Sequence, residues 1–401
     1  MAKALFLGLP LHGHTNPSLP LVRELVARGD EVVYYSADSF AAKIEAAGAR
    51  YRPYRSAFLT DLGRLPERTE ELSWLLMQAT ADVLTLHLNE FRAERADYLI
   101  ADSVAPWGQW AGEALGVPVV TSVSTFAINR HVLAFAASHG VRPKSVKRLL
   151  SKVHHVYKAV RLGRRLRREY RVAGPGITGL VFGRSRLNIV YTSRHVQPRA
   201  DTFDDSFQFV GPAVEIPADS VPASGHEASR KPVVYVSLGT LFNDDAAFYR
   251  NCFEALAGEE VDVIMSIGTN VPKASLGSAP ANFMVEAHVR QLEVLGRASA
   301  FVSHGGMNSV NESLSRAVPI LVVPQMSEQE MVGRRVEELG AGLYLAKAQA
   351  TPAAIRGSVA KLLAEPGFRQ QAAIARQSFR TAGGAARAAG AIRAFTSESP
   401  C

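Results

Sequence analysis

The chain has 401 residues, of which 47% are apolar and 20% charged; this composition excludes wholesale disorder and leaves material for about two or three domains. The formal charge of +8 comes from one segment: residues 142–171 hold twelve Lys or Arg and the single acid Glu169, whereas the rest of the chain holds 33 basic and 36 acidic residues. Two cysteines, Cys252 and Cys401, are too few for a disulfide framework or a zinc site of four cysteines.

The start of the chain has no secretory signal pattern, because the apolar run from Ala4 to Leu11 is short and is followed at once by His12-Gly13-His14. No apolar run approaches the ~20 residues that a membrane-spanning helix needs. We therefore expect a soluble cytoplasmic protein, either a monomer or a homodimer.

In the first half of the chain, short apolar runs alternate with stretches of helical periodicity. Because the runs are continuously apolar and are followed by helices, they indicate a parallel sheet that is covered on both faces. The expected strands are Ala4–Gly8, Glu31–Tyr35, Tyr98–Ala101 and Val117–Val120, and the expected helices are Leu19–Arg28 and Ser39–Ala47.

The pattern then restarts, with strands expected at Val233–Thr240, Val261–Ile267, Ala300–His304 and Pro319–Pro324. The sequence therefore predicts an α/β protein with two Rossmann-like, doubly wound parallel-sheet domains that face a cleft. The predicted parts are an N-terminal domain over residues 1–213, a linker at 214–232, a second domain over 233–379, and a C-terminal helix at about 380–398 that joins the first domain.

The segment Phe301–Glu312 combines a strand, a glycine turn and the start of a helix. A helix N-terminus presents free N–H groups and a partial positive charge, which favour a diphosphate, and the two glycines allow an anion to approach closely. His304 and Ser309 would add hydrogen-bond donors, and the Glu312 carboxylate would accept from both hydroxyls of a ribose. An ordinary turn in which Ser309 and Glu312 form a capping box explains the same residues.

A second glycine turn, Ser237-Leu238-Gly239-Thr240, opens the same domain and would hold further phosphate oxygens. Neither half carries a G-x-G-x-x-G motif after its first strand, which disfavours a dinucleotide-dependent oxidoreductase. The chain also has no Asp-x-Asp pair that would bridge a metal ion to a nucleotide.

His14 lies just after the first expected strand, and Asp102 directly follows the strand Tyr98–Ala101. Both would lie at the carboxyl edge of one parallel sheet, where a carboxylate can fix the tautomer of a histidine that acts as a general base. The residues alone favour a plainer interpretation, in which His14 and Asp102 each cap the helix that follows.

In this order, these segments resemble the family 1 glycosyltransferases that use nucleoside-diphosphate sugars, most closely the bacterial macrolide-glycosyltransferase type. The resemblance covers essentially the whole chain, and its most specific part is residues 282–345, which include Pro324-Gln325-Met326-Ser327-Glu328-Gln329. It implies the GT-B fold, in which the N-terminal half binds the acceptor and the C-terminal half binds the donor.

The resemblance also implies a role for each residue that matches a family motif. It makes His14 the general base and Asp102 the residue that orients it, and it gives the diphosphate, ribose and sugar contacts to the second domain. The donor-binding residues that it implies are Ser237, Thr240, His288, Val289, Gln291, His304, Gly306, Asn308, Ser309, Glu312, Glu328 and Gln329.

The reaction that the resemblance implies is an inverting transfer of a sugar, with glucose as the first choice, from a UDP-sugar to a lipophilic polyketide, macrolide or phenol. It needs no metal and no bound cofactor. Two alternatives remain: a sugar-nucleotide epimerase of the same two-domain shape, which would turn over donor without acceptor, and a non-catalytic sugar-nucleotide-binding protein, in which His14→Ala would change nothing.

One position departs from the family pattern. Where the family has an aromatic residue and then Val-Pro-Gln to seat the nucleotide base, this chain has His288-Val289-Arg290-Gln291. An imidazole offers a smaller stacking face than Trp or Tyr, so the sequence leaves the choice between uracil and thymine open.

The basic segment 142–171 has three interpretations: a solvated helical surface, a weak contact with an anionic membrane, or a contact with an acidic acceptor or partner protein. Nucleic acid is not expected, because no nucleic-acid-binding fold accompanies the charge. The acceptor itself is unidentified. Phe58, Trp74 and Phe126 are predicted to line its pocket, with simple core packing as the alternative.

Overall fold

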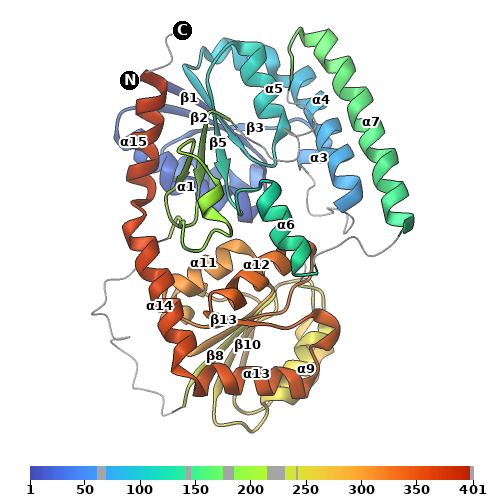
Figure 1. Ribbon diagram of the computed structural model, residues 1–401, viewed down its shortest axis with the longest axis vertical. Coiled ribbons are helices and arrows are strands. Elements are labelled where there is room, and N and C mark those ends of the chain that lie inside the picture. The colour runs from blue at the N-terminus through green and yellow to red at the C-terminus, as the bar shows by residue number, and fades with distance from the viewer. Residues whose placement is uncertain (61–68, 141–145, 175–184, 215–230, 241–242, 398–401) are drawn as a thin grey trace. The chain divides into compact units, whose positions relative to one another are not determined.

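Two parallel sheets organise the chain in the computed structural model (Figure 1), which describes residues 1–60, 69–140, 146–174, 185–214, 231–240 and 243–397. The chain divides into two compact units. The first comprises Met1–Thr192, Arg199–Ala213 and Ala382–Cys401, and the second comprises Ser193–Pro198 and Val214–Thr381. Most of the predicted linker, residues 215–230, lies outside the described residues.

The first unit is built on a seven-stranded sheet in the order β3-β2-β1-β4-β5-β6-β7. Its strands are β1 (Lys3–Leu7), β2 (Glu31–Ser36), β3 (Arg50–Pro53), β4 (Tyr98–Asp102), β5 (Val119–Val123), β6 (Leu187–Val190) and β7 (Phe207–Phe209). Its helices are α1 (His12–Ala27), α2 (Ala41–Ala46), α3 (Ala57–Thr60), α4 (Thr69–Glu94), α5 (Pro106–Leu115), α6 (Arg130–Ser138), α7 (Val146–Tyr170) and α15 (Gly384–Ser397), with short 3-10 turns at Asp38–Phe40 and Ala200–Thr202.

The second unit is built on a six-stranded sheet in the order β10-β9-β8-β11-β12-β13. Its strands are β8 (Val233–Ser237), β9 (Asp262–Ser266), β10 (Phe283–Glu286), β11 (Ala300–Ser303), β12 (Ile320–Val322) and β13 (Gly342–Tyr344). Its helices are α9 (Ala246–Leu256), α10 (Gln291–Leu295), α11 (Met307–Ser315), α12 (Ser327–Glu338), α13 (Pro352–Ala364) and α14 (Pro366–Thr381), with 3-10 turns at Lys273–Leu276 and Lys347–Gln349.

Both sheets share one topology. In each, the first strand of the unit lies in the middle, between the second strand and the fourth, which is the doubly wound order with a switch point beside the first strand. The strands that flank this point are in register, so Leu7 pairs with Ala101 and Ser237 pairs with Ser303. Loops that leave the carboxyl ends of these strands are therefore neighbours, and such a crevice is where ligands bind in α/β sheets.

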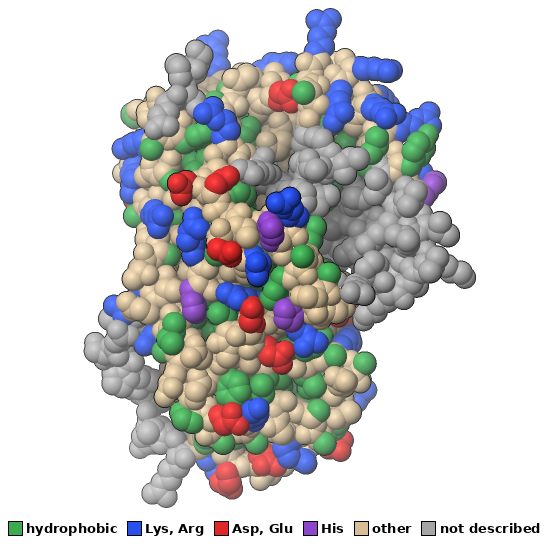
Figure 2. All heavy atoms as spheres, viewed as in Figure 1, with side chains coloured by type: hydrophobic (Ala, Val, Ile, Leu, Met, Phe, Trp, Pro, Cys, Tyr) green, Lys and Arg blue, Asp and Glu red, His purple; other side chains and the backbone are tan. Residues whose placement is uncertain are grey.

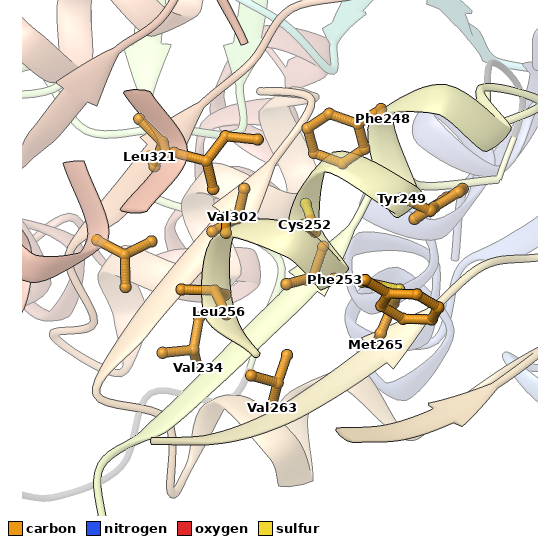
Figure 3. Packing of buried hydrophobic residues seen from close by; sticks show 14 of the residues in the cluster. Val234, Phe248, Tyr249, Cys252, Phe253, Leu256, Val263, Met265, Val302 and Leu321 are labelled. Atoms are coloured by element: carbon orange, nitrogen blue, oxygen red, sulfur yellow. The ribbon is translucent and has the colours of Figure 1, made fainter. Parts of the chain in front are cut away.

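The apolar runs form strands because both of their faces are covered. In the second unit, α9 places Phe248, Cys252 and Leu256 over the sheet, where they meet strand residues such as Val234 and Val263 (Figure 3). In the first unit, the C-terminal helix α15 packs on the N-terminal part of the chain. Its residues Ala388, Ala389 and Ile392 join the core cluster of β1 and β2. Arg393 Nη2 donates to the Arg28 carbonyl at 3.0 Å.

Several predicted boundaries are wrong, by up to seven residues. The largest error is in α1, which begins at His12 rather than Leu19 and contains Pro17 and Pro20. A proline inside a helix removes a hydrogen bond and disfavours a helical residue before it, which is why the sequence predicts a later start. Burial of Thr15, Pro17 and Ser18 against the sheet compensates. Similarly, β5 runs to Val123 rather than Val120.

No helix in the described part of the chain is both long and apolar enough to cross a bilayer.

Candidate active site

The carboxyl edge of the first sheet brings His14 and Asp102 together. His14 lies in the first turn of α1, after β1, and Asp102 is the last residue of the adjacent strand β4. The His14 Nδ1 and Asp102 Oδ2 atoms are 2.9 Å apart, and the carboxylate is almost fully buried. The other carboxylate oxygen, Oδ1, accepts a hydrogen bond from the Val104 backbone N–H at 2.8 Å.

This geometry replaces the simpler capping interpretation. The N-cap of α1 is Leu11, and α5 begins only at Pro106, so neither side chain is the N-cap of its helix. An ionised Asp102 favours the tautomer in which Nδ1 carries the proton, because the carboxylate only accepts. Nε2 then holds the lone pair that a general base needs.

A third residue, Ser124, completes this group and was missed from the sequence. Its Oγ lies 2.9 Å from His14 Nδ1, and its side chain is buried at the end of β5. The signal was present, since Ser124 directly follows a strand beside β4, but the strand was expected to end at Val120. The imidazole follows β1, and the two strands next along the sheet, β4 and β5, each place one polar residue beside its Nδ1.

The loop before His14 is held close to the sheet by Tyr34. A Cβ added at Gly8 would lie 2.7 Å from the Tyr34 ring, so only glycine allows the chain to pass there. Tyr34 OH lies 3.0 Å from Ser18 Oγ, which in turn donates to the Thr15 carbonyl at 2.8 Å. This packing fixes the first turns of α1 and with them the backbone of His14.

In the second unit, His304 lies against two glycine turns. It directly follows β11. A Cβ added at Gly239 would lie 2.6 Å from the His304 Cε1 atom, and a Cβ added at Gly306 would lie 2.4 Å from its Nε2 atom. Gly239 also has a φ of +79°, which other residues rarely adopt. Burial lowers the pKa of His304 to about 4, so this ring is neutral at neutral pH and can donate one N–H.

Other predicted diphosphate contacts surround the start of α11. Gly306 is the N-cap of this helix, Asn308 is in its first turn and Ser309 is buried. Ser237 ends β8, where its Oγ accepts from the Gly239 N–H at 3.2 Å, and Thr240 is exposed just beyond the turn. The turns after β8 and β11, at the switch point of the second sheet, therefore bring these residues to one end of the sheet.

Glu312 is held by Gln291 rather than by a capping box. Because α11 begins at Met307, the interpretation in which Ser309 is the N-cap is wrong. Gln291 Nε2 instead donates to Glu312 Oε2 at 2.6 Å, while the Tyr235 hydroxyl donates to Gln291 Oε1 at 3.1 Å and fixes the orientation of the amide. Burial raises the pKa of the Glu312 carboxyl, although the bond from Gln291 opposes the shift.

Glu328 and Gln329 lie in the first turn of α12. Glu328 is exposed, whereas Gln329 is buried and its Oε1 accepts from the backbone N–H groups of Gln325 and Met326 at 2.7 and 3.3 Å. Gln329 Oε1 thus caps the N-terminus of its own helix, and its amide N–H₂ is the part of the side chain that can donate.

The predicted base seat lies after β10. His288 and Arg290 are exposed, Val289 is half-buried, and Arg290 Nη1 pairs with Glu293 Oε1 at 3.0 Å.

The three predicted acceptor residues lie in different surroundings. Phe126 is buried, and Phe58 and Trp74 are half-buried against the core cluster that contains Leu9 and Met77. Trp74 also lines a groove between α4 and α7. In the part of the chain that the structure describes, no three His, Cys, Asp or Glu side chains converge to hold a metal ion.

Comparison with known proteins gives matches along the whole chain. Residues 250–383 match the family described as Erythromycin biosynthesis protein CIII-like, C-terminal domain. The NDP-glycosyltransferase YjiC of Bacillus licheniformis is 33% identical over 397 residues, which cover 96% of each protein. The demethyllactenocin mycarosyltransferase of Streptomyces fradiae is 29% identical, and the match covers 99% of this chain and 87% of that protein.

Solved structures agree. The crystal structure of CalG4, the calicheamicin glycosyltransferase, superposes with a TM-score of 0.81 at 28% identity and covers 100% of both chains.

Proposed function

The chain belongs to the bacterial family 1 glycosyltransferases and has their GT-B fold, and from this premise we propose that it transfers a hexose, most readily glucose, from a UDP-sugar to a lipophilic small molecule with inversion at the anomeric carbon. The observation that supports the proposal best is the 2.9 Å contact between His14 Nδ1 and Asp102 Oδ2. A buried carboxylate that sets the tautomer of a histidine at a sheet edge is the arrangement of a general base.

In the proposed reaction, His14 Nε2 accepts the proton of the acceptor's nucleophilic group as that group attacks the anomeric carbon. The bond between this carbon and the diphosphate oxygen breaks, and the diphosphate leaves with the electron pair. Asp102 stabilises the imidazolium that forms, and the proton later passes to solvent. A single displacement from the face opposite the leaving group inverts the configuration.

The leaving diphosphate gains negative charge, and we propose that the second unit stabilises it. The N-terminus of α11 supplies backbone N–H groups and a partial positive charge, and His304 and Ser309 add donors. Glu312, already oriented by Gln291, would accept from the ribose hydroxyls. These groups would do the work of a metal ion, so we propose that none is required.

The proposed acceptor class follows from the relatives. One of them is named for a mycarosyl transfer to demethyllactenocin, and CalG4 is named for calicheamicin. We propose by likeness an acceptor of the same broad kind, a polyketide, macrolide or phenol, and we propose that the protein works in the cytoplasm.

A screen that crosses UDP- and TDP-sugars with phenolic and macrolide acceptors, read by mass spectrometry, tests the proposal. We expect a product heavier by one hexose with UDP-glucose, and a β-linkage by NMR. His14→Ala should lower the rate by about 10²–10⁴-fold while UDP binding in calorimetry is retained. Epimerised donor in the absence of acceptor, or full activity of His14→Ala, would contradict the proposal.

A further inference from the structure

Within the basic segment, residues 157–171 form an outer surface that the proposed reaction does not use. Its helix, α7, packs against α4 and lies on the outside of it, away from the sheet (Figure 1). The side of α7 that faces α4 is closed: Ala159 and Leu166 are buried, and Tyr170 OH lies 3.3 Å from Thr85 Oγ1. In the part of α7 from Tyr157 onward, whose side chains are described, the apolar side is therefore covered by protein.

The exposed side of α7 is cationic. We call this surface the α7 basic face; its side chains are Lys158, Arg161, Arg164, Arg165 and Arg168, all exposed. Together with Trp74 and Leu162 they line a groove of about 610 Å³. Figure 2 shows Lys and Arg side chains gathered at the upper right, where Figure 1 places the upper part of α7.

Few carboxylates neutralise this face. Arg165 pairs with Glu169 at 3.4 Å, with its side chain still 75% exposed. Among the described residues, no carboxylate lies within ion-pair distance of Arg161, Arg164 or Arg168. These like charges repel one another on a single helix surface, a cost that an anionic partner would remove.

Aromatic side chains accompany the charge. Tyr157 is 63% exposed on the same face, and Lys158 Nζ lies 5.7 Å above the ring of Trp74 in the groove. Tyr and Trp with Arg and Lys are the residues that favour the headgroup level of a bilayer, where an apolar ring and a polar tip are both satisfied.

We propose that the α7 basic face attaches the enzyme reversibly to a bilayer that contains anionic phospholipids. Phosphate groups of the lipids would meet the arginines in and beside the groove, and Tyr157 would lie among the headgroups. The attachment is electrostatic rather than by insertion, because Ala159 and Leu166 of α7 are buried in the core cluster that it shares with α4. An outermost helix can meet a flat partner without rearrangement.

The benefit of this attachment, though not the attachment itself, rests on the proposed function. A lipophilic acceptor partitions into bilayers, so an enzyme held at the surface would meet it at a higher local concentration. α7 belongs to the first unit, the one to which acceptor binding is assigned by the family resemblance.

Co-sedimentation of the full-length protein with vesicles tests the proposal. The vesicles are phosphatidylcholine alone or with about one third phosphatidylglycerol, at about 0.1 M and about 0.5 M NaCl. We expect the protein to pellet only with the anionic vesicles, and only at the lower salt. In the triple variant Arg161→Gln, Arg164→Gln, Arg168→Gln, partitioning should fall by more than about tenfold.

The matched control is Arg23→Gln, Arg92→Gln, Arg297→Gln, which removes the same charge from exposed positions elsewhere. It should bind vesicles nearly as wild type does. Both triple variants should glycosylate a water-soluble phenol at the wild-type rate, which shows that they are folded and separates this proposal from that of function. The proposal is wrong if the two triple variants lose vesicle binding equally. It is also wrong if the wild-type protein binds single-stranded DNA in fluorescence anisotropy but does not bind the anionic vesicles.

Discussion

Ser124 Oγ and His14 Nδ1 lie 2.9 Å apart, in a site where Asp102 Oδ2 lies at the same distance from the same nitrogen. If Nδ1 carries the proton, as the carboxylate requires, Ser124 can only accept from it, and the N–H is shared between the two oxygens. Ser124 therefore helps to hold the ring in one orientation and favours the imidazolium that proton abstraction produces. It acts through His14 and is a positioning residue.

We expect Ser124→Ala to lower kcat by about fivefold, the equivalent of one hydrogen bond worth about 1 kcal/mol, with little change in the KM for acceptor. Because the lost acceptor favoured the charged ring, the acid limb of the kcat/KM profile should move to lower pH. Steady-state rates across the pH range measure both effects.

Ser122→Ala is the matched control for this substitution. Ser122 is equally buried on β5, but its Oγ donates to the Tyr191 hydroxyl at 3.1 Å and not to His14. It should cost similar stability without moving the pH profile. If the two variants give the same profile, Ser124 has only a structural role.

The close packing of Gly306 on His304 gives a second prediction. Gly306 has an ordinary backbone conformation, so the obstacle to Gly306→Ala is the imidazole, whose Nε2 would lie 2.4 Å from the new Cβ. We expect this substitution to lower the free energy of unfolding by about 1–3 kcal/mol and to weaken binding of UDP-glucose. Chemical denaturation and calorimetry are the measurements.

His304→Ala removes the obstacle, so the double variant should be more stable than the sum of the single effects predicts, by about 1 kcal/mol or more. Gly357→Ala serves as the control, because a Cβ there meets nothing within 4 Å. In the interior of α13 it should stabilise the protein by up to about 1 kcal/mol. Additive effects of Gly306→Ala and His304→Ala would mean that the ring is not the constraint.

The sequence predicted the fold class and the family correctly, because both depend on patterns that are local in the chain. Continuous apolar runs such as Val233–Ser237 predict buried parallel strands, and the motif after Phe301 carries the family resemblance. The structural matches confirm both. The proximity of His14 and Asp102 was also predictable, because both lie at the carboxyl ends of neighbouring strands of one sheet.

Contacts between distant side chains were not predictable in this way. Tyr235 acts on Gln291 across 56 positions, and nothing in the periodicity of β8 marks its hydroxyl. The sequence does not indicate Ser124, because it predicts that the strand ends at Val120, three residues before the observed end of β5 at Val123. The position of a strand end decides which residues reach the site. The position of Trp74 in the groove beside α7 likewise depends on how α4 and α7 pack.

The base seat provides a third prediction. His288 is exposed after β10, at the position where the family has a larger aromatic residue. We expect His288→Trp to tighten UDP binding by about 1–3 kcal/mol in calorimetry, because a larger ring offers more stacking area to the base. His288→Ala should weaken it. The same affinity in all three proteins would place the base elsewhere.

Finally, the low pKa of His304 makes the stability of the protein depend on pH in a predictable direction. Burial lowers this pKa from 6.5 to about 4 in the folded chain. Well above pH 6.5 the ring is neutral in both the folded and unfolded states and contributes no pH dependence. Between about pH 6.5 and 4 the unfolded state binds the proton and the folded state does not, so stability falls as the pH is lowered.

The ring of His304 should account for about 3 kcal/mol of lost stability over this interval, at about 1.4 kcal/mol per pH unit. Denaturation of wild type and His304→Gln at several pH values isolates this effect, because the other titrating groups are common to both proteins. We expect the stability of the variant relative to wild type to rise as the pH falls from 6.5 and to level off near 4. An NMR titration of the His304 ring should show its midpoint near 4, and a midpoint near 6.5 would contradict the prediction and mean that water reaches the imidazole.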